Sequence, residues 1–221
     1  MRRIVGAAFI TLDGVIQGPG GPKEDTTGGF RFSGWLPPVG DDGIDHKIGE
    51  LFGRPFDLLL GRRTYEIFAA YWPYASDQMA GIRDPFNACT KYVVTHRDAP
   101  LDWENSQRVG AIEALRGIKQ GDGPDIVIQG SSTLYPQLLE AGLLDQLTLM
   151  ISPVVLGDGK RLFGDGTPPR TLKLTEHYVS DGGNIVATYQ PAGPVEIGTY
   201  VTEAPSEREK ARQAEMAEGS W

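Results

Sequence analysis

Cysteine and histidine are scarce in this chain of 221 residues, which holds one cysteine, Cys89, and three histidines. A single cysteine excludes an intrachain disulfide, and no cysteine–histidine spacing typical of a zinc site is present. Without an evident histidine partner, Cys89 is more typical of a buried small residue than of a nucleophile. We therefore expect no metal centre and no thiol chemistry.

Positive charge and long apolar runs are also lacking. The formal net charge is −8, and an acidic surface repels the phosphate backbone, so broad nucleic-acid binding is not expected. No apolar run approaches the roughly 20 residues of a membrane span. The opening MRRIVGAAFITLDG turns polar too early for a signal peptide. These absences predict a soluble, cytoplasmic protein that contacts neither nucleic acid nor membrane.

Short apolar runs alternate with helical patterns through the middle of the chain, and strands alone close it. A loop rich in Gly and Pro spans residues 13–40, and Asp181-Gly182-Gly183 is typical of a hairpin turn. Strands are predicted at 4–12, 56–60, 91–95, 125–129, 146–156, 171–180, 184–190 and, with less support, 197–201. Helices are predicted from 41 or 42 to 52 and at 64–71, 79–86, 111–119 and 131–141, the last with Gly142 at its end.

This order predicts an α/β fold: a mostly parallel mixed sheet, helices on both of its faces, and a C-terminal antiparallel hairpin. A length of 221 residues suits one domain with a tail. We place the domain at residues 1–203. Residues 204–221 are charged and poor in apolar side chains, which is typical of a frayed helix or a disordered tail.

Three predicted strand ends carry glycine, hydroxyl or basic residues. They are Gly61-Arg62-Arg63-Thr64, Thr95-His96-Arg97 and Gly130-Ser131-Ser132-Thr133. Ligands of open α/β sheets bind at the carboxyl ends of the strands, and helix N-termini favour anions. The repeated pattern therefore suggests a phosphate-bearing ligand. The alternative is structural: Thr64 and Ser131 cap helices, and the arginines are solvated.

The ordered segments TLDGVIQGPGG, GRRTYE, VVTHR and IQGSSTLYPQLL resemble the dihydrofolate reductase fold. The segment GLLDQLTLMISPVVLGDGKRLF is similar to the C-terminal reductase domain of the bacterial riboflavin-biosynthesis deaminase/reductase and its stand-alone relatives. The resemblance covers roughly residues 2–191. It implies a three-layer dihydrofolate reductase-like fold, NADPH-dependent reduction and a homodimer.

The resemblance also implies roles for individual residues. It places Gly61, Arg62, Arg63 and Thr64 on the cofactor, with an arginine toward the 2′-phosphate. It places Thr95, His96 and Arg97 on the adenosine side, and Gly130, Ser131, Ser132, Thr133 and Leu134 around the pyrophosphate.

On the substrate side, Asp45 corresponds to the acidic residue of the first helix that contacts the pterin in folate enzymes. Asp45 would orient or protonate a heterocycle, or it is an exposed first-turn carboxylate that favours the helix dipole. Asp13 is a second candidate, with a structural role in the loop as its alternative. Trp35 is either a lid over the substrate or an anchor of the loop.

Several departures limit the transfer of a substrate. The arginine that grips the folate tail has no counterpart, because the matching place falls near Cys89 in NACTKYVVT. The deaminase half is absent, and the insert GGPKEDTTGGFRFSG enlarges the first loop. Lys23, Arg31 and Lys160 are candidates for a substrate phosphate, although ordinary surface charge is the simpler interpretation.

The sequence therefore predicts an NADPH-dependent reductase of a small heterocyclic or carbonyl compound. A pyrimidine reductase of riboflavin synthesis is the second hypothesis. A non-catalytic nucleotide-binding protein and a structural dimer module without a ligand are the rivals from other classes.

Overall fold

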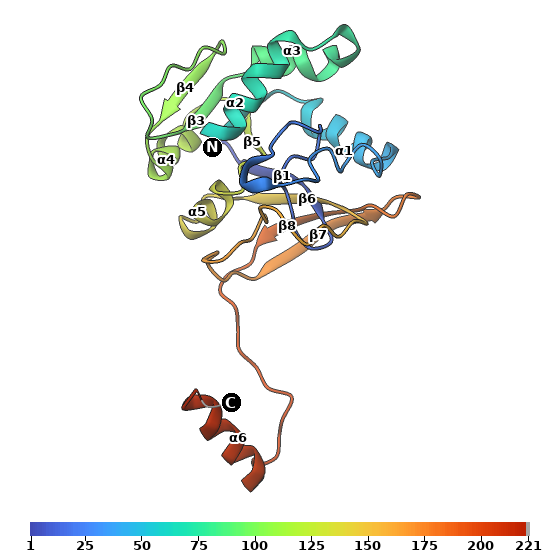
Figure 1. Ribbon diagram of the computed structural model, residues 1–221. Helices are drawn as coiled ribbons and strands as arrows, with labels where there is room; N and C mark the ends of the chain where they lie inside the picture. The colour runs from blue at the N-terminus through green and yellow to red at the C-terminus, as the bar shows by residue number, and fades with distance from the viewer. Residues whose placement is uncertain (220–221) are drawn as a thin grey trace.

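A single eight-stranded sheet forms the centre of the protein in the computed structural model, which describes residues 1–219 (Figure 1). The strands are β1 (Ile4–Thr11), β2 (Phe56–Gly61), β3 (Lys91–Val94), β4 (Ser106–Val109), β5 (Asp125–Gln129), β6 (Gln146–Ser152), β7 (Leu172–Val179) and β8 (Ile185–Pro191). The helices are α1 (Asp42–Phe52), α2 (Arg62–Tyr71), α3 (Ala80–Ala88), α4 (Leu115–Gln120), α5 (Leu134–Glu140) and α6 (Glu207–Ala217). Four short 3₁₀ turns lie at Thr27–Gly29, Trp72–Tyr74, Asp77–Met79 and Ile112–Ala114.

The strand order is β4-β3-β2-β5-β1-β6-β8-β7. The first six strands in this order run parallel, and β8 pairs antiparallel with both β6 and β7. The predicted mostly parallel sheet with a C-terminal antiparallel hairpin is therefore confirmed. The carboxyl ends of β2, β5 and β1, which are adjacent strands, meet at one edge.

Alternate residues of the central strands enter two separate cores, which makes the fold three-layered. On one face, Ile126 and Ile128 of β5 pack with residues of α4 and α5. On the other face, Val127 packs with residues of α1, α2 and α3. A strand buried on both faces is expected to be apolar at successive positions, as Ile126 to Ile128 of β5 are. The prediction of helices on both faces is confirmed.

Several predicted elements and boundaries were wrong. No strand was predicted at β4, and residues 197–201 form no strand. Strand β6 ends at Ser152 rather than at 156, and α5 begins at Leu134 rather than at 131. The last difference has a backbone cause: Gly130 and Ser131 both have positive φ (80° and 62°), a conformation that a right-handed helix excludes.

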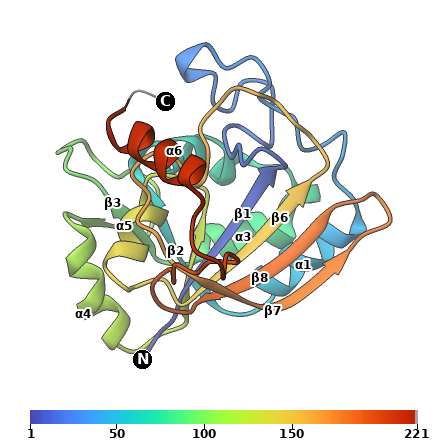
Figure 2. The ribbon, with the colours of Figure 1, turned by 90° about the horizontal axis from the view of Figure 1, so that it is seen from below.

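After β8 the chain leaves the sheet. Residues 192–206 contain no helix or strand, and α6 stands apart from the sheet at the end of this segment (Figure 1). In the view from below, α6 lies in front of the domain (Figure 2). Ser206 caps α6 by accepting a hydrogen bond from the Glu209 N–H group. The domain boundary predicted at residue 203 falls within the extended segment.

Candidate functional site

A large cleft opens at the edge where β2, β5 and β1 end. Its volume is about 1910 Å³, above the range of roughly 300–1,000 Å³ that is usual for small ligands. Its walls come from α1, α2, the first loop, residues 129–133 and residues 160–167. The cleft is large enough for a dinucleotide together with a second, smaller ligand.

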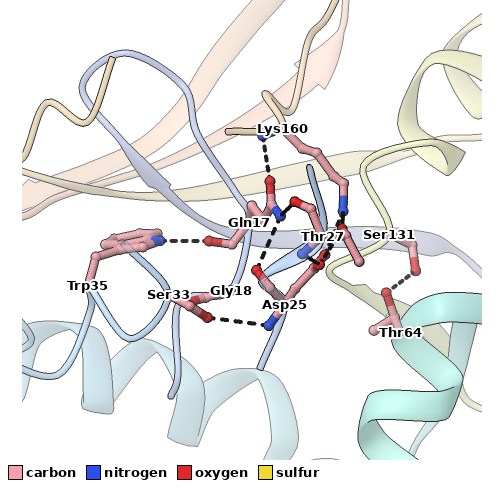
Figure 3. Close-up of polar contacts among 9 residues, drawn as sticks. All are labelled: Gln17, Gly18, Asp25, Thr27, Ser33, Trp35, Thr64, Ser131 and Lys160. Atoms are coloured by element: carbon pink, nitrogen blue, oxygen red, sulfur yellow. Dashed lines mark hydrogen bonds and ion pairs between the residues drawn. The ribbon is translucent and has the colours of Figure 1, made fainter. Parts of the chain in front are cut away.

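The β2–α2 junction and the loop after β5 form one wall of the cleft. Ser131 joins them, because its hydroxyl accepts a hydrogen bond from the Gly61 N–H group and donates one to Thr64 Oγ1, both at 2.8 Å (Figure 3). This wall contains Gly61, Arg62, Arg63, Thr64 and Gly130 to Thr133. The structure therefore brings together two of the three predicted strand-end motifs.

The N–H groups of Ser132 and Thr133 have no acceptor within residues 1–219. They follow two successive residues with positive φ and precede the first turn of α5. Backbone N–H groups that are left free by such a turn suit an anion. The Ser131 hydroxyl is already used within the protein, so the donors that remain in this loop are mainly backbone groups.

The two arginines at the start of α2 differ in their surroundings. The guanidinium of Arg62 is engaged within the protein. It donates to the Glu66 carboxylate at 2.7 Å and to the carbonyl oxygens of Ala99 and Pro100 at 3.1 and 3.2 Å. Arg63 is exposed, lines the cleft and has no polar partner in the described part of the chain. Arg63 is therefore the arginine available to a ligand anion.

The third strand-end motif lies further out along the edge. Thr95 is buried, and its hydroxyl accepts a hydrogen bond from the Arg97 N–H group at 3.1 Å. His96 and Arg97 are exposed. None of these three residues lines the cleft, and neither does Leu134, whose side chain is buried in the core below α5.

The opposite wall is formed by α1 and the end of β1. It combines the carboxylate of Asp45 with the apolar side chains Phe9, Ile44, Ile48 and Phe52. Helix α1 begins here because Asp41 accepts hydrogen bonds from the N–H groups of the next turn. Asp45 is exposed toward the cleft, so an acidic group stands beside an apolar surface.

Trp35 and Asp13 do not line the cleft. Trp35 is 7% exposed, packs with Val15 and Phe30, and donates its indole N–H to the carbonyl oxygen of Gln17 at 3.0 Å. This is the position of a loop anchor, the alternative given above to a lid. Asp13 accepts hydrogen bonds from the Thr11 hydroxyl and from the N–H groups of residues 156 and 157. Burial alone would raise the pKa of Asp13, but these bonds lower it.

A polar cluster in the first loop was not found from the sequence. Lys160 Nζ donates to Asp25 Oδ2 at 2.6 Å and to Thr27 Oγ1 at 2.7 Å (Figure 3). Gln17 accepts from the Lys160 N–H group and donates to the carbonyl oxygens of Asp25 and Thr27. Lys160, a candidate for a substrate phosphate, is therefore already paired. Burial alone would raise the pKa of Asp25, but the bonds from Lys160 and Thr27 lower it.

Glu24 is a second unforeseen group of this loop, and it lines the cleft. Its carboxylate accepts hydrogen bonds from the N–H groups of Gly20 and Gly21. Burial raises the pKa of Glu24 despite these two bonds. The only sequence signal was its place in a long loop of Gly and Pro residues.

Residues 1–219 contain no group of three or more His, Cys, Asp or Glu side chains arranged to hold a metal ion. Burial raises the pKa of Cys89 to about 12, which leaves its thiol protonated at neutral pH. None of the helices in the same range is long and apolar enough to cross a membrane.

The sheet order and the placement of the cleft define an α/β protein of the dihydrofolate reductase-like fold, and comparisons with known proteins agree. A dihydrofolate reductase from Enterococcus faecalis, solved with NADP(H), aligns with a TM-score of 0.53 at 18% identity and covers 86% of this chain and 96% of its own. A pyrimidine reductase-like protein from Corynebacterium diphtheriae aligns with a TM-score of 0.56 at 15% identity. The alignment covers 86% of this chain and 92% of that protein.

The family follows from the sequence match. The model of the RibD C-terminal domain matches residues 2–186. The chain belongs to this family. The protein YyaP of Bacillus subtilis is 26% identical over 194 residues, which cover 85% of this chain and 94% of YyaP. The family resemblance and the fold predicted from the sequence are both confirmed.

Proposed function

We propose that the protein is an NADPH-dependent reductase of a small heterocyclic compound. One observation carries the proposal: a single cleft holds free backbone N–H groups and an unpaired arginine on one wall, and a carboxylate with an apolar surface on the other. The first wall suits a phosphorylated nucleotide, and the second suits a flat ring. Membership of the RibD C-terminal domain family supports the same function.

The phosphates of the cofactor would lie on the wall made by Gly61, Thr64 and residues 130–133. The N–H groups of Ser132 and Thr133 would donate to the pyrophosphate, and the N-terminus of α2 adds a favourable dipole. Arg63 would pair with the 2′-phosphate that distinguishes NADPH from NADH. Arg62 would act indirectly, by holding the 99–100 segment in place.

The adenosine end would extend toward Thr95, His96 and Arg97, which lie outside the cleft. These residues follow β3, the neighbour of β2, so they stand beside the cofactor wall at the same edge of the sheet. Their exposure is consistent with the solvent-facing end of a dinucleotide. Leu134 would support the loop from below rather than contact the phosphates.

Bound NADPH would supply the hydride, so the chain itself has to align the acceptor, exclude water and manage one proton. The side chains of Phe9, Ile48 and Phe52 would hold a flat ring and keep water from it. Asp45 would orient the ring or hold a proton at its polar edge. Glu24 is a second acid in the cleft, and its raised pKa favours the protonated form.

A pyrimidine reductase of riboflavin synthesis is the second candidate. The family name and the pyrimidine reductase-like relative from Corynebacterium diphtheriae favour it. In such an enzyme, residues 2–186 would be the reductase domain. A protein that binds the nucleotide without turnover would keep the first wall of the cleft and lack activity with every heterocycle.

We also propose a cytoplasmic homodimer, on the strength of the family membership. The edge strand β7 carries two exposed apolar side chains, Leu174 and Val179. They support a dimer in which the second subunit covers this edge. Light scattering of the purified protein should give twice the chain mass, and a monomer at micromolar concentration would remove the proposal.

A titration with NADPH and NADH tests the function directly. Reduced-nicotinamide emission and tryptophan fluorescence should report tight, salt-sensitive binding of NADPH and much weaker binding of NADH. Heterocycles would then be screened for oxidation of the bound nicotinamide. Failure of both nucleotides to bind would refute the reductase, and binding without turnover would favour the nucleotide-binding alternative.

A further inference from the structure

Gln129 is the last residue of β5, and its side chain lines the cleft. Its carbonyl oxygen, Oε1, is buried and has no hydrogen-bond partner within residues 1–219. The Nε2 group has no partner in this range either, but it is not buried, so it is the end of the amide that a ligand can reach. A buried carbonyl oxygen without a partner is unfavourable, and a bound water, ion or ligand group is one explanation for such an atom in a folded protein.

Other buried side-chain atoms in the described range also lack a partner, namely Ser106 Oγ, Ser152 Oγ and Asn184 Oδ1. None of these residues lines the cleft. Gln129 is therefore distinguished by its position and not only by its missing bonds.

The position of Gln129 is the junction between the two walls of the cleft. The next residue, Gly130, starts the loop of the cofactor wall. Across the sheet, Gln129 pairs with Ala7 of β1, two residues before Phe9 of the apolar wall. A ligand group bound at this point would be either the substrate ring, which accepts the hydride, or the nicotinamide ring, which gives up the hydride.

We propose that Gln129 is a specificity residue that recognises a planar amide, an N–H beside a C=O, on a ring in this cleft. The inference rests on the proposed reductase function and deepens it. A glutamine side chain presents one donor and one acceptor side by side, so once it turns both toward the cleft it can pair with a planar amide through two hydrogen bonds. Two ligands carry such an edge: the carboxamide of nicotinamide, and the lactam of an oxidised heterocycle.

The test compares the wild type with Gln129→Met, which keeps the length and removes both polar ends. Ser106→Ala is the matched control, because it removes a buried unpartnered atom away from the cleft. Binding of NADPH and of 2′-phospho-ADP-ribose, which lacks nicotinamide, forms one arm. Binding of lumazine and of 1,3-dimethyllumazine, whose lactam N–H groups are methylated, forms the other arm.

If Gln129 recognises nicotinamide, Gln129→Met should weaken the binding of NADPH about tenfold and leave the binding of 2′-phospho-ADP-ribose unchanged. If Gln129 recognises the substrate, wild type should bind lumazine about tenfold more tightly than 1,3-dimethyllumazine. Gln129→Met should abolish that difference in affinity. Ser106→Ala should behave as wild type in both arms.

The proposal is overturned if neither arm responds to Gln129→Met, and equally if wild type binds neither lumazine nor the nicotinamide ring. These outcomes are separate from failure of the reductase function itself. Binding of 2′-phospho-ADP-ribose reports the phosphate wall alone, so its absence refutes the cofactor site, and its presence with no effect of Gln129→Met refutes only the role of Gln129.

Discussion

Replacing Gly130 by alanine should weaken NADPH binding more than it destabilises the fold. Gly130 has a φ of 80°, and a Cβ atom there would lie 3.2 Å from Thr64 Cγ2 and 3.5 Å from Thr64 Oγ1. Thr64 Oγ1 accepts the Ser131 hydroxyl, so a displaced Thr64 would disturb the loop that carries the free N–H groups. Gly142→Ala is the matched control: its φ is 63°, and no atom lies within 4 Å of the added Cβ.

Both variants place an alanine in the left-handed conformation, which lowers the free energy of unfolding by about 1 kcal/mol. In a domain of this size, that corresponds to a fall in Tm of roughly 2–4 °C. Gly130→Ala should lose somewhat more stability than Gly142→Ala because of the tight contact with Thr64. Loss of one hydrogen bond from a backbone N–H group to a phosphate costs about 1.5–3 kcal/mol, or roughly 10- to 100-fold in Kd.

Thermal unfolding and NADPH titration of both variants separate these two effects. Gly142→Ala should lose stability and keep the NADPH affinity of wild type. Gly130→Ala should lose both. A folded Gly130→Ala variant that binds NADPH like Gly142→Ala would refute the placement of the pyrophosphate on this loop.

Three further predictions concern charged residues of the cleft. Replacing Arg62 and Arg63 together by alanine should narrow the preference for NADPH over NADH about tenfold. The single Arg63→Ala should account for most of this change, and an undiminished ratio of Kd values would place the 2′-phosphate elsewhere. Asp45→Asn should lower kcat about 100-fold and flatten its pH profile with a heterocycle that oxidises NADPH; wild-type turnover across pH would remove Asp45 as proton donor. Because burial raises the pKa of Glu24 in the folded state, stability should fall as pH rises above the ordinary value of 4.5. Glu24→Gln keeps the acceptor for both backbone N–H groups, so its Tm advantage over wild type should grow from pH 4 to pH 8, and an equal offset at every pH would contradict this.

The fold was predictable because its local signals agree. The three central residues of β5, Ile126 to Ile128, are apolar, which is typical of a strand covered on both faces, and the structure places β5 between β2 and β1. Asp41 stands where a cap was expected and accepts the first N–H groups of α1. Gly142 follows α5 with positive φ, as a residue that ends a helix should.

Other features could not be predicted, because they depend on contacts between distant residues. Strand β4 reads Ser-Gln-Arg-Val, which lacks an apolar pattern; it forms by pairing with the edge of β3 and buries only Val109. The different roles of Arg62 and Arg63 depend on the segment at residues 99–100, far along the chain. The pairing of Lys160 with Asp25 joins two loops, and neither sequence segment indicates it.

The position of β1 has a consequence for folding during synthesis. Strand β1 is made first, yet it lies between β5 and β6, which begin at residues 125 and 146. A growing chain therefore carries an unpaired apolar strand at least until β5, which ends at residue 129, has been made. Such long-range pairing is slow, and an exposed strand edge is prone to aggregate. We expect a nascent chain that stops before β5 to be insoluble or chaperone-bound, and the cleft to form only after residues 129–161 have joined the N-terminal strand and loop.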